Sequence, residues 1–66
     1  MIKVKDLKIG DFFAFKVDGF TPARVYVRGV YCRELKKYSY YPFDDVNNEK
    51  FIKGDRLVYG PEDFVF

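Results

Sequence analysis

Tyrosine and basic residues recur at short intervals over residues 24–41, a pattern that could serve binding. Residues two apart in an extended strand share one face, so several of these side chains would form a single stripe. The candidate binding residues are Arg24, Tyr26, Arg28, Tyr31, Arg33, Lys36, Tyr38 and Tyr40. Exposed rings stack on the bases of single-stranded nucleic acid while Arg and Lys hold the phosphates. The same residue types anchor protein–protein interfaces, and Tyr–Arg pairs also stabilise sheet surfaces without any ligand.

The residue types offer little for catalysis. The chain has no His, one Cys (Cys32), one Ser (Ser39) and one Thr (Thr21), whereas a Ser or Cys nucleophile usually relies on a His base. Asp44 and Asp45 are neighbours, and in a strand they would point to opposite faces rather than share a proton. We therefore predict a protein that is not an enzyme, with no catalytic residues, no cofactor and no small-molecule substrate.

Metal binding and disulfide chemistry are not expected either. The segment 44–49, DDVNNE, resembles part of a calcium loop, but it lacks the glycine and the flanking helices of an EF-hand. Its Asn and Asp residues are typical of a turn. The single cysteine excludes an intramolecular disulfide, and Cys32 is expected to be a structural residue that points into the core.

Short strands separated by turn residues must position the candidate binding residues. We expect strands at 12–17, 23–33, 37–43, 51–52 and 56–59, with a last short strand at 63–66. A turn at 34–36 makes the second and third of these a β-hairpin, and a loop connects the first and second over residues 18–22. The preceding segment, 3–11, contributes Val4, Leu7 and Ile9 to one end of the core and closes with a Gly10-Asp11 turn.

The alternation of residues predicts which face of each strand is buried. In the first strand Phe13, Phe15 and Val17 share a face. In the next, Ala23, Val25 and Val27 would face the core, and the Arg and Tyr residues between them would face solvent. Gly29 lies within this strand and predicts a β-bulge, after which the alternation shifts. Val30 and Cys32 would then point inward, and Tyr31 and Arg33 outward.

Five or six short strands in 66 residues favour an all-β fold, namely one SH3-like barrel domain over residues 1–66, with an OB-like barrel as the alternative. Aromatic residues make up 21% of the chain, and each can bury a large area. They can therefore build a core in a domain that lacks disulfides and predicted metal sites.

The segments DLKIGDFFAF, VYVRGVY and KKYSYYPFDDVNNEKFIKGDRLVY together resemble a layout of short uncharacterised proteins from phages and bacteria. In that layout a Leu-x-x-Gly-Asp-Phe start precedes a β-meander that ends in Gly-Asp-x-x-Val. The resemblance covers nearly the whole chain and implies the small barrel, but it brings no catalytic motif. The residues that carry it are structural: Leu7, Gly10, Asp11, Gly29, Gly54, Asp55 and Val58.

Charge and hydropathy limit the partners. The net charge is only +2, but residues 1–43 carry +5 and residues 44–66 carry −3, which could create one basic face. No apolar run approaches a membrane span of about 20 residues and no signal peptide is recognisable, so a cytoplasmic location without membrane contact is expected. A protein partner or self-association through the Tyr/Arg face is the leading prediction, and single-stranded nucleic acid on the same face is the alternative.

Overall fold

Antiparallel β-strands and one 3₁₀ turn make up the regular structure. The structure is a computed structural model that describes residues 1–18, 21–22 and 24–63. The elements in chain order are β1 (Ile2–Lys3), η1 (Val4–Asp6), β2 (Phe12–Phe13), β3 (Val17–Asp18), β4 (Thr21–Pro22), β5 (Tyr26–Cys32), β6 (Lys37–Pro42), β7 (Lys50–Ile52) and β8 (Leu57–Val58). The predicted all-β class is confirmed.

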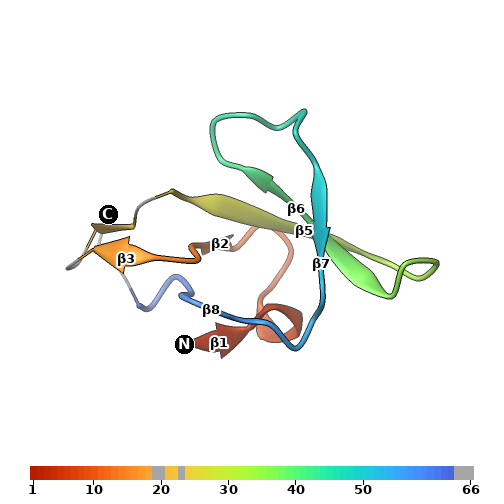
Figure 1. Cartoon of the computed structure of the whole chain (residues 1–66), viewed down its shortest axis with the longest axis horizontal. Coiled ribbons are helices and arrows are strands. Elements are labelled where there is room, and N and C mark those ends of the chain that lie inside the picture. Colours follow the sequence, from red (N-terminus) through yellow and green to blue (C-terminus); the bar gives the residue numbers. More distant parts are fainter. Residues whose placement is uncertain (19–20, 23, 64–66) are drawn as a thin grey trace.

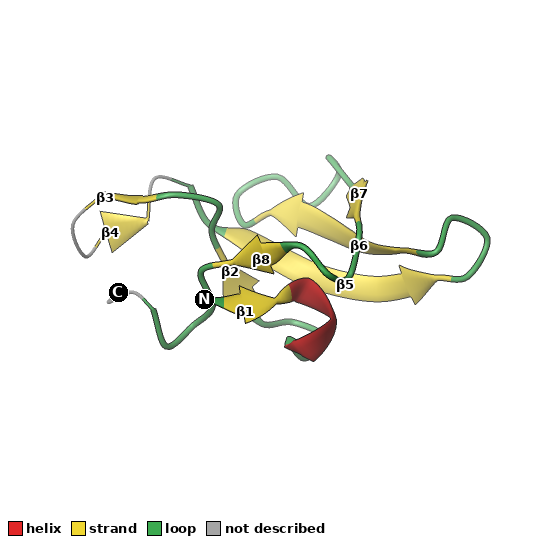
Figure 2. Ribbon diagram, turned by 60° about the horizontal axis from the view of Figure 1, so that its bottom comes forward, coloured by secondary structure: helices red, strands yellow, loops and turns green. Residues whose placement is uncertain are grey.

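The strands form one larger and two smaller sheets. The larger sheet has four strands in the order β2-β5-β6-β7, and two-stranded sheets pair β1 with β8 and β3 with β4. The β5–β6 hairpin is the longest feature, and its turn projects beyond the other strands (Figure 1). Strands β1 and β8 lie side by side along one side of the larger sheet (Figures 1 and 2). We call the sheet face toward β1 and β8 the inner face and the opposite one the outer face.

A β-bulge interrupts the hairpin at the predicted position. Arg28 pairs with Tyr40 and Tyr31 with Tyr38, so β5 has one extra residue between these pairs. A side chain at Gly29 would approach the Ser39 carbonyl oxygen to 3.2 Å and the Ser39 hydroxyl more closely still. Only glycine fits there. The bulge shifts the alternation as predicted, because Arg28 and Tyr31 now lie on the same sheet face.

The core lies between the inner sheet face and the β1–η1–β8 layer. Its fully buried members come from η1 and its end, from β2 and from β8, and half-buried rings of the sheet pack against them. Phe13 is opposite Tyr26 in the sheet register, and its ring centroid lies 5.5 Å from that of Phe15. The predicted shared face of Phe13 and Phe15 is confirmed. The buried cluster consists of Val4, Leu7, Phe13 and Val58, with Ile2, Phe15, Tyr26, Tyr38, Tyr40 and Ile52 around it.

The predicted orientation of β5 is only partly right: Val27 is buried as expected, but the residues on either side of it are not turned toward solvent. Tyr26 packs on the core, and Arg28 is only 8% exposed, whereas both were expected to face solvent. The reason is the pairing with β2, since Phe13 and Tyr26 occupy the same face. A tyrosine ring buries more area than a valine, and the aliphatic stem of an arginine packs as an apolar group. Both faces of this strand were therefore suited to burial, and alternation could not distinguish them.

Cys32 and Val30 also lie on the opposite sheet face from the one predicted. Cys32 pairs with Lys37 on the outer face and is partly exposed, so the expectation that it points into the core is wrong. Val30 is 58% exposed rather than buried. The same inversion explains both, because residues that share a face with Val27 after the bulge lie outside the core.

Three further expectations need correction. Val4 and Leu7 are buried as predicted, but Ile9 is exposed. The single strand expected at 12–17 is divided: β2 pairs with β5, Ala14 forms a bridge with Tyr59, and β3 leaves to pair with β4. Segment 18–22 therefore contains a strand rather than only a loop. The orientation expected for Ala23, and most of the strand expected at 63–66, lie outside the described residues.

Candidate functional site

A hollow rich in lysine lies between the hairpin turn, η1 and the connection from β7 to β8. It has a volume of about 420 Å³. Four cationic side chains and two tyrosines line it, together with Leu35, Gly54 and a single acid, Asp55. We call this hollow the lysine cleft; its lysines and tyrosines are Lys5, Lys36, Lys37, Lys53, Tyr31 and Tyr38.

Backbone contacts between distant segments assemble the lysine cleft. The Lys5 amide donates a hydrogen bond to the Gly54 carbonyl over 2.9 Å, and the Val4 amide donates one to the Arg56 carbonyl over 3.0 Å. These bonds hold η1 against the β7–β8 connection. Gly54 also allows the approach of Tyr38, because a side chain on Gly54 would lie 2.7 Å from the Tyr38 ring. Lysines from three separate segments therefore line the same hollow as the Tyr38 ring.

The two tyrosines of the lysine cleft contact each other across the hairpin. Their ring centroids are 4.8 Å apart. Tyr38 packs on the core, while Tyr31 is 46% exposed beyond it. The Arg28 guanidinium carbon lies 4.3 Å from the Tyr38 ring centroid, a cation–π geometry. An exposed ring supported by a fixed ring and an arginine is a suitable platform for stacking a planar group.

The positive charge of this region is not neutralised within the described part of the chain. Ion pairs there join only the Met1 amino group to Asp63 and Arg24 to Asp44. The four lysines of the cleft and Arg28 are thus without ion-pair partners among the described residues. The Arg28 Nε is buried and has no hydrogen-bond partner among the described residues. Its guanidinium packs on the Tyr38 ring instead.

Only part of the predicted Tyr/Arg stripe belongs to the lysine cleft. The structure brings together Tyr31, Lys36 and Tyr38, with Arg28 stacked behind Tyr38. Arg33 is exposed in the hairpin turn, and the cleft lining does not include it. Arg24 lies elsewhere, at 5.8 Å from the Tyr26 ring centroid and 4.0 Å from an Asp44 oxygen.

Tyr26 and Tyr40 belong to the aromatic cluster of the inner sheet face. Their ring centroids are 5.4 Å apart, and both rings contact Phe13 and Phe15. Burial raises the pKa of Tyr40, the neighbouring Tyr26 adds to this rise, and the Arg56 guanidinium opposes it. These two rings pack against the core, so they do not form the free stacking surface that the sequence predicted.

Sequence reasoning missed three of the cationic residues. Lys37 follows the predicted turn directly, and the hairpin register places it beside the Tyr31–Tyr38 pair, opposite Cys32. Lys5 and Lys53 carry no such signal, because their proximity depends on long-range backbone bonds, such as that between Lys5 and Gly54, which join distant segments.

The outer face of the four-stranded sheet is apolar and partly uncovered. Phe12, Val27 and Tyr41 occupy one row across the sheet, and the Phe43 ring lies 5.4 Å from that of Phe12. Phe43 is 61% exposed and Phe51, on the last strand, is 41% exposed. Exposed apolar groups of this kind mark interaction surfaces when they are contiguous.

Other site types find no support among the described residues. Groups of three or more His, Cys, Asp or Glu side chains that could hold a metal ion do not occur there. The described part of the chain also contains no helix long and apolar enough to cross a membrane. Comparison of the chain with protein-family models, with curated proteins and with solved structures gives no match.

Proposed function

We propose that the protein is a non-enzymatic binding module that holds single-stranded nucleic acid in the lysine cleft. The observation that carries this proposal is the group of four lysines, without ion-pair partners in the described part of the chain, around the exposed ring of Tyr31. Lysines attract the phosphates of a single strand, and an aromatic ring stacks on its bases regardless of sequence. Duplex DNA fits less well, because its bases are already stacked on one another.

The fold context supports this proposal. A strongly bent hairpin with a bulge, covered on one side by short strands, fits a small SH3-like or OB-like barrel that is open on part of its circumference. Such barrels present sheet faces and loops to ligands. The proposal also retains a cytoplasmic location and kinship with the short phage and bacterial proteins of similar layout, as expected from the sequence.

Binding of oligothymidylate, measured by fluorescence anisotropy at several salt concentrations, tests the proposal. We expect Lys37→Gln and Lys53→Gln each to weaken binding and to reduce the slope of log K against log salt by about one. Tyr31→Ala should cost roughly 1–3 kcal/mol of binding free energy because a stacked base is lost. Lys50→Gln is the matched control, since Lys50 is exposed but is not among the residues that line the cleft.

Two results would contradict nucleic-acid binding. The first is an affinity that does not change with salt. The second is competition by polyglutamate as effective as competition by unlabelled oligonucleotide, which would point to an acidic protein segment as the ligand.

A second candidate function is self-association through the outer sheet face. Its support is the exposure of Phe43 and Phe51 around the row of Phe12, Val27 and Tyr41. These residues carry no charge, so two copies could meet there without burying a charged side chain of this row. A second copy is therefore the occupant that we propose for this face.

Sedimentation equilibrium over a concentration series tests this candidate. We expect the parent chain to dimerise at high concentration and Phe51→Lys to remain monomeric, because two like charges would then meet at the interface. Leu35→Lys is the control, since Leu35 is equally apolar and exposed but lies in the hairpin turn. A parent that stays monomeric throughout, or two variants that behave alike, would argue against a dimer through this face.

A further inference from the structure

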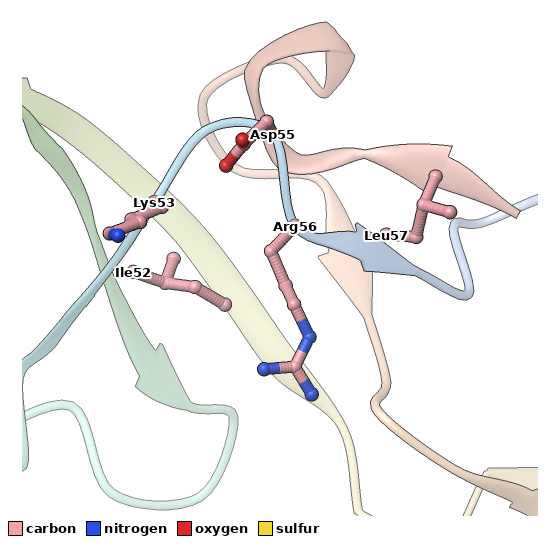
Figure 3. A pocket seen from close by; sticks show the side chains of 5 residues that line it. All are labelled: Ile52, Lys53, Asp55, Arg56 and Leu57. Atoms are coloured by element: carbon pink, nitrogen blue, oxygen red, sulfur yellow. The ribbon is translucent and has the colours of Figure 1, made fainter.

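A second hollow adjoins the lysine cleft. It has a volume of about 460 Å³ and is lined by Ile52, Lys53, Asp55, Arg56 and Leu57, which Figure 3 shows. Two of these residues, Lys53 and Asp55, also line the lysine cleft. The two hollows therefore adjoin at the β7–β8 connection and share its side chains. We call the second one the Arg56 pocket.

Arg56 lines this pocket and lies against an aromatic ring. Its guanidinium carbon lies 5.2 Å from the Phe15 ring centroid, so the ring supports the side chain from one side. The carboxylate of Asp55 and the guanidinium of Arg56 point in different directions (Figure 3). The described residues include no ion-pair partner for Arg56. A stacked guanidinium keeps its N–H groups free for two parallel bonds to a phosphate.

Phe15, the ring that contacts Arg56, belongs to the aromatic cluster of the inner face, where it packs on Tyr26 and Tyr40. The Arg56 guanidinium opposes the rise that burial causes in the pKa of Tyr40. Tyr40 is protonated near neutral pH, because burial, the largest influence on it, raises its pKa. Ile52 supplies an apolar wall, and Lys53 adds a second cation at the border with the lysine cleft.

We infer that the Arg56 pocket is a second phosphate subsite, into which a single strand held by the lysine cleft continues across Lys53. This inference rests on the proposed function and adds a length requirement to it. An oligonucleotide that is too short to cross Lys53 occupies only the lysine cleft. A longer one gains the contact with Arg56, so affinity should rise with length and the rise should depend on this residue.

Oligothymidylates of about three and about eight nucleotides, a range chosen from the site sizes of small barrels, separate the two subsites. For Arg56→Gln we expect unchanged binding of the short oligonucleotide and a loss of about threefold to tenfold for the long one. The salt slope should fall by about one for the long oligonucleotide only. Arg33→Gln is the control, because Arg33 is an exposed arginine outside both hollows.

A second variant tests whether weaker binding by Arg56→Gln could result from a loss of structure. Arg56→Lys keeps the charge but lacks the planar fork of guanidinium, so its long-oligonucleotide affinity should lie between those of the parent and Arg56→Gln. Amide spectra of each variant check the fold.

The outcomes distinguish this inference from the function on which it rests. If Arg56→Gln binds the long oligonucleotide as well as the parent does, or weakens both lengths equally, the second subsite is refuted while binding in the lysine cleft stands. If the parent binds neither length, the proposed function itself fails and the inference fails with it.

Discussion

Tyr38 is the residue that connects the core to the lysine cleft. Its ring packs on the buried cluster, lies close to the Gly54 backbone, contacts the tilted Tyr31 ring and supports the Arg28 guanidinium. Neither a free surface ring nor a purely internal one would make all of these contacts. The exposed Tyr31 therefore rests on a platform that the fold itself holds in place.

The difference between Tyr26 and Tyr31 can be measured as stability. Tyr26→Ala should lower the free energy of unfolding by about 2–4 kcal/mol, approaching the value for a fully buried ring, because its ring packs on Phe13 and Phe15. Tyr31→Ala, the matched control, should cost less than about 1 kcal/mol, since Tyr31 lies largely outside the core. Chemical denaturation monitored by circular dichroism gives both values. Equal losses, or a larger loss for Tyr31, would mean that the inner face has been assigned to the wrong residues.

For single residues, the sequence indicated which residue types could bind a ligand better than it indicated where each of them lies in the fold. Tyr31, Lys36 and Tyr38 were candidates because tyrosine and basic residues recur along the predicted hairpin, which is a local property, and they line one hollow. Lys5 and Lys53 were not, because their proximity depends on the pairing of η1 with the β7–β8 connection. Tyr26 was placed on the wrong face, because both faces of β5 carry residues that burial favours.

The β5–β6 hairpin is the element that positions the candidate site. Its turn residues, its bulge and the end of β6 follow the sequence pattern closely, since each depends on a local signal: a charged turn, an internal glycine and a proline at the strand end. The shorter strands were predicted less well. β2 and β3 could not be separated from the sequence, because the division reflects which distant strand each one pairs with.

The bulge at Gly29 can be tested by adding a methyl group. Gly29→Ala should destabilise the protein markedly, because the new Cβ would collide with Ser39 on the opposite strand. Ser39→Gly, combined with Gly29→Ala, should recover part of the loss by removing the hydroxyl. A double-mutant cycle of unfolding free energies measures this coupling. Losses that simply add would show that Gly29 and Ser39 do not meet.

For the molecule as a whole, the grouping of charge in space does not follow the division of charge along the sequence. The lysine cleft combines Lys5, Lys36 and Lys37 of the basic first part with Lys53 of the acidic second part. A separate hollow near the amino terminus collects acids from both parts, Asp6, Asp11, Glu62 and Asp63. The net charge of +2 therefore understates how basic the candidate site is. The lysines of the cleft come from both halves of the chain.

A two-dimensional amide NMR titration with oligothymidylate, at low and at moderate salt, tests the central claim most directly. The account predicts shifts that weaken with salt and that cluster at Lys5, Tyr31, residues 36–38 and residues 53–56, with the outer-face residues Phe43 and Phe51 unaffected. An absence of shifts at low salt, or shifts confined to the outer face, would contradict the assignment of the lysine cleft as a nucleic-acid site.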